Sequence, residues 1–465
     1  PDKAYINTKD LTDFGSLENK RVTEGEVSFA LCRPDGTVYS GYLAADEAPE
    51  EPEAGSLWLD TGGDETALRK YGEDGWTAVD DVCVRMNATG IGIGFTAGDG
   101  VAVSGCRETA LNGSFPLRSV EDDYVVVTAL PRSLSSQSDP VTVERSVPDM
   151  DYVVESGNRL WGCKYGIVNG QAVNAIYASK LGDFKNWNCY AGLSTDSYAA
   201  SRGSDGAFTG AADYLGNPLF FKENCMERVY PSASGAHQIV TVQCAGVKSG
   251  SSGSLRVVDG KLYYHSQGGV CVFDGSMPVH VSQALGEMRY HNAVAGALDG
   301  SYYLSAADEN GAWHLLVLDT RQGLWYREDG VEAVGFAPWG GDLYCLTAAG
   351  QLLAMKGSGE NREGPVQWLA ETGELGLDAP ESRYLVRLSL RLLPEADSTV
   401  RAWVSYDEGG SWQPAGSLCG VGRLRACTMH VRPRRCRQLR LRLTGQGGCR
   451  IYSLSAVYEK GSDGP

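Results

Sequence analysis

Arginine is concentrated toward the C-terminus of this sequence, and its side chain suits the binding of carboxylates and phosphates. Residues 383–450 contain 13 arginines, no lysine and four acids, a charge of 13 − 4 = +9. The planar guanidinium group can bind such anions through two parallel hydrogen bonds, which lysine cannot do. Side chains two residues apart in a strand share a face, so Arg440 and Arg442 are expected side by side. The candidate residues for contact with an acidic protein partner, or in second place with DNA, are Arg432, Arg434, Arg435, Arg437, Arg440 and Arg442.

Four aromatic residues in the middle of the chain could instead bind sugar rings by stacking. They are Trp161, Trp187, Tyr190 and Tyr198. Cleavage of a glycan additionally requires a pair of carboxyl groups. The nearest acids are expected to cap turns instead; they are Asp183, Asp196, Asp205 and Asp213. Glycan binding or cleavage is therefore the alternative function.

The segment SYDEGGSW at 405–412 matches the Asp-box pattern S-x-D-x-G-x-[ST]-W. Its acid can accept backbone N–H bonds, its glycines tolerate positive φ, and its tryptophan can pack beneath the turn. We interpret it as a structural hairpin turn. Its pattern residues are Ser405, Asp407, Gly409, Ser411 and Trp412.

The familiar catalytic and metal-binding motifs are missing from the sequence. The six histidines lack metal-ligand spacing, and there is no C-x-x-C, phosphate-loop or G-x-S-x-G motif. The 13 cysteines are scattered among apolar residues, which predicts small buried side chains kept reduced in a cytoplasm. We therefore expect no catalytic residue, no cofactor and no metal, and a protein that is not an enzyme.

Short strands separated by Asp-Gly and Asn-Gly turns predict an all-β protein. A turn followed by an aromatic or aliphatic strand recurs about every 40 residues, as expected for the blades of a β-propeller. The five copies are GNRLWGC (157–163), GNPLFFKE (216–223), DGKLYYHS (259–266), DGSYYLSA (299–306) and GGDLYCLT (340–347). The stretches FGSLENKRVTEGEV and VTVERSV (141–147) are candidates for further propeller strands. No apolar run is long enough to span a membrane.

Five regions follow from these patterns. Residues 1–31 form an N-terminal segment associated with the propeller, and 32–82 an acidic inserted hairpin. Within that insertion, residues 35–81 have 13 acids and two bases, a charge of 2 − 13 = −11. Residues 83–140 form a small OB- or SH3-like barrel, 141–360 the β-propeller, and 361–465 a basic β-sandwich of jelly-roll type.

Residues 141–357 resemble β-propeller virion structural proteins of tailed bacteriophages and prophages. The segments that carry the resemblance are RSVPDMDYVVESGNRLWGC, NAIYASKLGDFKNWNCYAGLSTD and SLRVVDGKLYYHSQGGVCVFDG. Their layout is similar to that of packaged-DNA stabilization proteins and tail hub or nozzle proteins. AGDGVAVSGCRETALNGSFPLRSV is similar to small barrels of head–tail joining proteins, and GSLWLDT with GWTAV looks like a hairpin common in phage tail proteins.

The resemblance implies a virion protein of the neck or tail, made in the bacterial cytoplasm. Such a protein would dock neighbouring subunits and help retain or guide packaged DNA. Its partners would be other neck or tail proteins, further copies of itself and the packaged DNA. The alternative is a glycan-binding or glycan-cleaving propeller that acts in receptor recognition at the tail tip.

Overall fold

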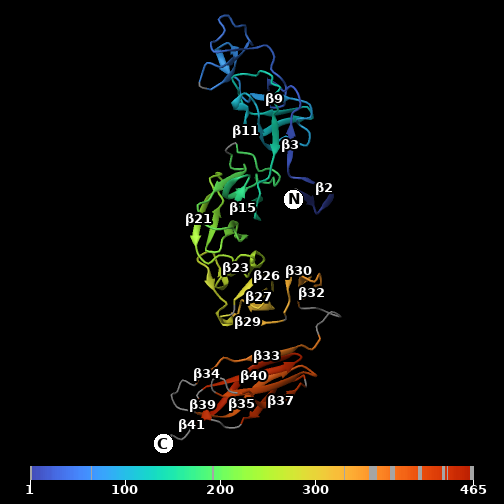
Figure 1. Ribbon diagram of the computed structural model, residues 1–465, viewed down its shortest axis with the longest axis vertical. Helices are drawn as coiled ribbons and strands as arrows, with labels where there is room; N and C mark the ends of the chain where they lie inside the picture. Colours follow the sequence, from blue (N-terminus) through green and yellow to red (C-terminus); the bar gives the residue numbers. More distant parts are fainter. Residues whose placement is uncertain are drawn as a thin grey trace. The chain divides into compact units, whose positions relative to one another are not determined.

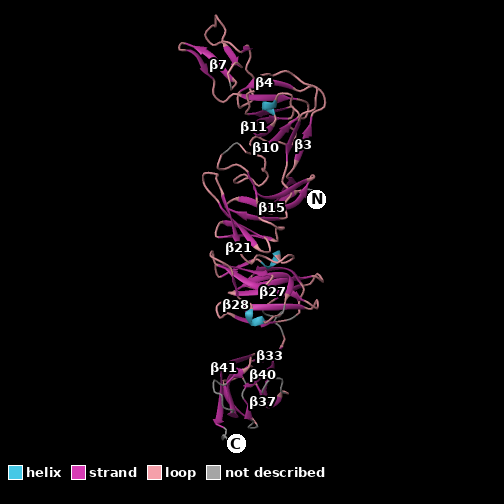
Figure 2. Ribbon diagram, turned by 60° about the vertical axis from the view of Figure 1, so that its left-hand side comes forward, coloured by secondary structure: helices cyan, strands magenta, loops and turns pink. Residues whose placement is uncertain are grey.

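The computed structural model is built almost wholly of β-strands, with three short 3-10 helices (Figure 2). It describes residues 3–355, 364–376, 383–406, 411–420, 422–431, 435–436 and 438–460, apart from 64, 191–192, 288 and 329. Two compact units, Pro1–Leu353 and Ala354–Pro465, make up the chain. Within the described residues, no helix is long and apolar enough to cross a membrane.

The N-terminal part of the first unit is a hairpin followed by a curled seven-stranded sheet (Figure 1). The hairpin consists of β1 (Ala4–Asn7) and β2 (Asp10–Ser16). The curled sheet, in spatial order, consists of β3 (Asn19–Val22), β13 (Thr142–Arg145), β10 (Gly100–Ser104), β11 (Gly113–Glu121), β12 (Tyr124–Val127), β9 (Cys83–Asn87) and β4 (Ser28–Cys32). A 3-10 helix, η1 (Thr109–Leu111), lies between β10 and β11.

Two segments expected in the propeller belong to this barrel-like sheet instead. Strand β13, from the VTVERSV stretch, pairs with β10 on one side and with β3 on the other. Val141 and Val143 are fully buried in the core of the sheet. Arg145 forms a buried ion pair with Asp99 and donates to the carbonyl of Leu17. Of the N-terminal segment 1–31, β3 and β4 are therefore barrel strands rather than propeller strands, because they pair with β13 and β9, while β1 and β2 form the separate hairpin.

The acidic insertion forms a separate four-stranded sheet between β4 and β9. It consists of β5 (Tyr42–Ala45), β6 (Leu57–Asp60), β7 (Ala67–Gly72) and β8 (Gly75–Ala78). Strands β6, β7 and β8 form an antiparallel meander, and β5 pairs parallel to β6. Trp58, Tyr71 and Trp76 pack together, with ring centroids 5.2–5.5 Å apart along the series. The rings cover part of the sheet, while Leu59 and Leu68 are buried in the same hydrophobic cluster as the barrel residues.

Five consecutive antiparallel sheets follow, and they are the blades of the β-propeller. Each of the first four has four strands, while the described part of the fifth has three. The first two blades are β14 (Tyr152–Ser156), β15 (Arg159–Val168), β16 (Gln171–Ala178), β17 (Tyr198–Ser201), and β18 (Gly210–Tyr214), β19 (Asn217–Phe221), β20 (Cys225–Tyr230), β21 (Gln238–Gln243). The third is β22 (Arg256–Val258), β23 (Lys261–Ser266), β24 (Gly269–Phe273), β25 (Val279–His280), preceded by the 3-10 helix η2 (Ser252–Ser254). The fourth is β26 (Tyr290–Leu298), β27 (Ser301–Asp308), β28 (Trp313–Asp319), β29 (Leu324–Arg327), preceded by η3 (Gln283–Leu285), and the fifth is β30 (Ala333–Trp339), β31 (Asp342–Thr347), β32 (Leu352–Ala354).

The repeat found in the sequence is confirmed, since its five copies are the second strands of the five blades. Tight turns set the register of each blade. Asn169 and Gly170 have φ values of 49° and 79°, and Asp299 and Gly300 have φ values of 50° and 77°. Two successive positive φ values are the geometry of the two-residue hairpin that matches strand twist, and Asn, Asp and Gly tolerate it best.

Aromatic rings fill the interfaces between successive blades. Trp161 of the first blade and Phe220 of the second belong to one buried cluster. Phe221 and Tyr264 join the second and third blades, with ring centroids 5.0 Å apart. At the last interface a Cβ on Gly296 of β26 would lie only 2.7 Å from the Phe336 side chain, so glycine lets β30 approach.

The second unit is a two-sheet β-sandwich. One sheet has the order β33 (Gln367–Glu371), β40 (Gln438–Gln446), β36 (Thr399–Tyr406), β37 (Gln413–Cys419), with β34 (Leu375–Gly376) also paired to β40. The other consists of β38 (Arg425–His430), β35 (Arg383–Pro394), β39 (Arg435–Cys436) and β41 (Cys449–Lys460). Alternating Leu and Val residues of β35, β36 and β40 form its core.

We predict that Arg145→Met lowers the stability of the barrel by about 3–5 kcal/mol, because it leaves the buried Asp99 carboxylate unpaired. Amide hydrogen exchange in β10 and β13 would measure the loss. Arg107→Met is the matched control, because Arg107 and Asp139 form an ion pair that is largely exposed and contributes about 0–1 kcal/mol. Equal effects of the two substitutions would contradict the prediction.

Candidate functional site

A hollow of about 1060 Å³ lies where the chain passes from the third blade to the fourth. The β23–β24 hairpin forms one wall, and the segment from β25 through η3 to the start of β26 forms the other. The residues that line it are His265, Gln267, Gly268, Gly269, Val270, His280, Ser282, Gln283, Leu285, Gly286, Glu287, Arg289 and Tyr290.

Two adjacent glycines bring the walls together. A Cβ on Gly268 would lie 2.8 Å from the His280 ring, and a Cβ on Gly269 would lie 2.2 Å from the Ser282 hydroxyl. Gly269 also has φ of 119°, in the region that favours glycine. His280 is held in place by Cys271, whose Sγ lies 3.4 Å from the ring Nδ1. The hairpin can therefore present its backbone and the His280 imidazole at one side of the hollow.

His265 is the most buried polar side chain of the lining, with 2% of its surface exposed. Its Nδ1 lies 3.1 Å from the Ser251 hydroxyl, which in turn accepts a bond from the Ala293 amide. A hydroxyl that already accepts this bond can donate its hydrogen to Nδ1, which leaves the proton of the neutral ring on Nε2. Burial, with smaller contributions from the charges of Lys248 and His291, lowers the pKa of His265 to about 4. At neutral pH the ring is therefore an uncharged hydrogen-bonding group.

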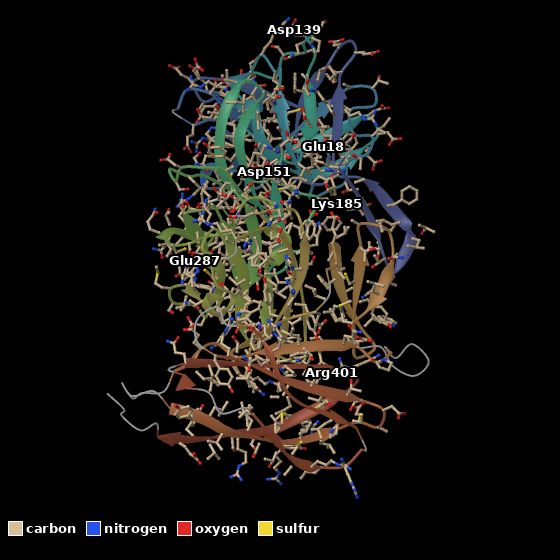
Figure 3. The ribbon with its side chains drawn as sticks, turned by 60° about the horizontal axis from the view of Figure 1, so that its bottom comes forward. Glu18, Asp139, Asp151, Lys185, Glu287 and Arg401 are labelled. Atoms are coloured by element: carbon tan, nitrogen blue, oxygen red, sulfur yellow. The ribbon has the colours of Figure 1, made fainter. Side chains whose placement is uncertain are left out.

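The remaining polar groups offer both donors and acceptors. Gln267, Gln283, Glu287 and Arg289 are exposed, and Figure 3 labels Glu287. Gln283 also donates through Nε2 to the carbonyl of His280, which fixes the turn that carries it. Planar amide, carboxylate and guanidinium groups can each bind two neighbouring hydroxyls. This mixture suits an uncharged polyhydroxylated ligand better than a strongly charged one.

The four aromatic residues predicted to stack on sugars lie elsewhere, and they do not form a platform. Trp161 is fully buried and Trp187 is 2% exposed. Trp161, Tyr198 and His237 pack against one another between the first two blades. Tyr190 is exposed, on the loop that also holds the buried Trp187. The prediction is wrong for the two tryptophans because the strand and loop that carry them direct their rings into the core.

The loop around Trp187 attaches the first blade to the barrel. Asn186 donates through Nδ2 to the carbonyl of Gly98, and Asn188 pairs with Ser146. The buried Arg159 guanidinium donates to the carbonyls of Ser179, Ser194 and Asp196 along the same loop. These contacts are structural.

Three of the four acids considered for glycan cleavage cap turns, as expected. Asp183 accepts from the amide of Lys185, Asp196 from that of Leu193, and Asp213 from that of Gly216. The hollow between the third and fourth blades has one carboxylate in its described lining, that of Glu287.

The Asp-box segment connects β36 to β37, which pair as a hairpin. Ser405 is buried at the end of β36 and Ser411 is exposed. Trp412 packs beside two arginines, with its ring centroid 4.0 Å from the Arg442 guanidinium carbon and 5.3 Å from that of Arg440. Asp407 and Gly409 lie outside the described residues.

Of the six candidate arginines, Arg440 and Arg442 can be placed. They share the outer face of β40 and both bind the Glu371 carboxylate, through contacts of 3.3 Å from Arg440 and 2.7 Å from Arg442. Arg432, Arg434 and Arg437 lie outside the described residues, as does the side chain of Arg435.

Across the described residues, no three His, Cys, Asp or Glu side chains gather in a way that could hold a metal ion. The cysteines that can be described are free thiols, and most are buried. Desolvation raises the pKa of Cys32 to about 12, so this thiol stays protonated at neutral pH.

Sequence reasoning missed the hollow because its residues carry no motif. His265 and His280 are 15 positions apart and lie on different strands, and Glu287 and Arg289 follow a short 3-10 turn. The one available signal was the Gly268–Gly269 pair inside a strand pattern, which marks a place where another part of the chain approaches closely.

No family model matches the chain, and no curated protein matches it. Several solved structures of hydrolases are similar to it. One is the exo-beta-1,3-galactanase of Phanerochaete chrysosporium with galactose, at 10% identity and a TM-score of 0.24, covering 64% of this chain and 95% of that one. Another is an engineered GH43 glycoside hydrolase with endo-xylanase and exo-arabinofuranosidase activity, at 9% identity and a TM-score of 0.23, covering 65% and 98%. A third is puromycin hydrolase, at 11% identity and a TM-score of 0.27, covering 65% and 48%.

These comparisons contradict the prediction that the chain is not an enzyme, because the similar structures are those of hydrolases. That prediction is withdrawn. The TM-scores are well below 0.5, so the function of this chain is derived from its own residues.

We predict that the free energy of unfolding falls as the pH is lowered from 7 to 4, in part because of His265. The unfolded side chain takes up a proton near its ordinary pKa of 6.5, whereas the folded one does so only near 4. The contribution of His265 to stability is fully present above pH 6.5, the pKa in the unfolded chain. It is lost as the pH falls from 6.5 to about 4, the pKa in the folded protein, and it amounts to about 3 kcal/mol at most. Chemical denaturation at several pH values should give a flatter profile for His265→Gln, and parallel profiles would refute the assignment.

Proposed function

We propose that this protein binds saccharides in the hollow between the third and fourth blades. The observation that carries the proposal is the lining itself, in which neutral imidazole, amide, carboxylate and guanidinium groups surround one cavity. Saccharides present rows of hydroxyls that are both donors and acceptors, and such ligands need groups of both kinds. The buried His265 imidazole, whose Nδ1 lies 3.1 Å from the Ser251 hydroxyl, contributes an uncharged hydrogen-bonding ring.

Binding is the proposed activity, and cleavage would need a further catalytic group. Glycoside hydrolysis ordinarily uses two carboxyl groups about 5–10 Å apart. The described lining supplies Glu287, and a second acid would have to come from a residue outside it. Release of reducing ends from a bound glycan would therefore show that a second acid takes part in cleavage.

We further propose that saccharide recognition serves attachment of a tailed-phage particle to its host. The support is the resemblance of residues 141–357 to propeller-bearing virion proteins and of the inserted hairpin to phage tail segments. In this setting the chain would contact other tail or neck proteins, further copies of itself and, at the neck, packaged DNA. Immunogold labelling of induced particles tests this placement: label at the tail tip would support attachment, and label at the neck would favour the connector role.

We predict that Glu287→Gln and Arg289→Gln each weaken saccharide binding by about 10- to 100-fold, because each removes a charged hydrogen bond worth about 1.5–3 kcal/mol. A glycan array would identify the ligand, and titration calorimetry would give its Kd. Glu309→Gln is the matched control, since Glu309 is an exposed acid in the turn between β27 and β28. If Glu287→Gln and Arg289→Gln bind the saccharide as tightly as the wild type and the Glu309→Gln control do, the hollow is not the binding site.

A further inference from the structure

Two segments of the chain that lie outside the hollow have strong and opposite charge. Residues 383–450 have a charge of +9, and residues 35–81 have a charge of −11. The first lies in the β-sandwich, and the second lies in the sheet inserted between β4 and β9. In each segment, part of the charge lies on described side chains.

The described arginines of residues 383–450 are divided between the two sheets of the sandwich, with Arg391, Arg425 and Arg450 on the β38–β35–β39–β41 sheet. Arg401, Arg440 and Arg442 lie on the outer face of the β33–β40–β36–β37 sheet, here called the Trp–Arg face. Its residues are Glu371, Arg401, Trp403, Trp412, Arg440 and Arg442. The residues of β36 and β40 that alternate with this set point to the opposite face of the sheet and are buried in the sandwich core, as Ala402 and Leu441 are. Trp403 lies directly opposite Arg442 across the ladder, so their side chains share this face.

Contacts within the Trp–Arg face hold its arginines in place. Arg442 donates through Nε to Glu371 at 2.8 Å, and its guanidinium lies over the Trp412 ring. Arg440 donates to the other oxygen of the same carboxylate at 3.3 Å. Two guanidinium groups thus share one acid, so the cluster keeps a net positive charge. Arg401 is exposed, no ion pair is found for it among the described residues, and Figure 3 labels it.

The acidic surface is the loop between β5 and β6, here called the acidic loop, residues 46–53. Its sequence DEAPEEPE contains five acids, all exposed: Asp46, Glu47, Glu50, Glu51 and Glu53. None of them forms an ion pair within the part of the chain that the structure describes. The loop also contains Pro49 and Pro52, which restrict its backbone and reduce the entropy lost on docking.

We infer that the acidic loop of one copy of this chain docks on the Trp–Arg face of a second copy. The acidic loop has five acids, and the Trp–Arg face has three arginines to one glutamate, so the two surfaces are opposite in charge. Arginine forks that are held in place are suited to paired carboxylates. Trp and Arg are also the residues that contribute most to protein interfaces. Because the surfaces differ, the contact is head-to-tail and generates rings or filaments rather than a closed twofold dimer. The inference does not depend on saccharide binding.

Sedimentation velocity of the full chain tests this contact. Self-association is expected at about 50 mM salt and should weaken strongly at about 500 mM, where charges are screened beyond a few ångströms. Glu50→Lys with Glu51→Lys, or Arg401→Glu alone, should each weaken association by about tenfold or more. A mixture of the loop-reversed and face-reversed chains should associate again, because each supplies the charge that the other now requires.

Two control variants make the same charge changes elsewhere. Glu73→Lys with Asp74→Lys reverses two exposed acids in the β7–β8 turn of the same insertion, and Arg391→Glu reverses an exposed arginine of β35 on the other sheet. Both should associate like the wild type. Equal loss in the controls would show that net charge alone is responsible, and would overturn the inference.

Other occupants of the Trp–Arg face give distinct results. A chain that stays monomeric at all salt concentrations overturns the inference. Contact of the acidic loop with the sandwich of its own chain also overturns it, and would be seen as a monomer whose sedimentation coefficient falls as salt is added. Duplex DNA is the third probe: if Arg401→Glu abolishes DNA binding but leaves self-association unchanged, the face binds nucleic acid instead.

Discussion

Each propeller blade is a single antiparallel sheet, and a single sheet has two faces that must be covered. This constraint determines where the large side chains of the chain are placed. Trp161, Phe221 and Tyr264 lie in the interfaces between blades, where they cover sheet faces that no α-helix covers in the described part of the chain. Polar groups that are buried in these interfaces must find hydrogen-bond partners there. Lys222 does so: its buried ammonium donates to Asn174 and to the carbonyl of Ser204 across the first two blades.

The hollow between the third and fourth blades is a local exception to this covering. There the chain leaves the third blade through a short strand and the η3 turn, so the interface is open on one side and polar groups reach water. His265 lies at its buried end and Glu287 and Arg289 at its rim. A hollow with polar walls can therefore form at the link between two blades without any change to the blades themselves.

Local patterns in the sequence were enough to predict the blades and a C-terminal β-sandwich. Asn169–Gly170 and Asp299–Gly300 require the turn geometry that they adopt, and β36 and β40 alternate as a one-sided sheet must. Partner choice was not predictable in the same way. Val141 and Val143 alternate equally well for a blade or a barrel, and only pairing with β3 and β10 decides. Burial of Trp161 and Trp187 likewise depends on neighbours distant in sequence, and so does the hollow.

The insertion leaves and rejoins the barrel at one point of the ladder, since Cys32 at the end of β4 pairs directly with Cys83 at the start of β9. A short turn could join these two neighbours without moving either strand, because the ends are already at cross-strand distance. Leu59 and Leu68 of the inserted sheet belong to the same buried cluster as the barrel residues, so the insertion can be exchanged only for one that covers the same part of the barrel core. The surface chemistry of the insertion can diverge between relatives independently of the fold that carries it.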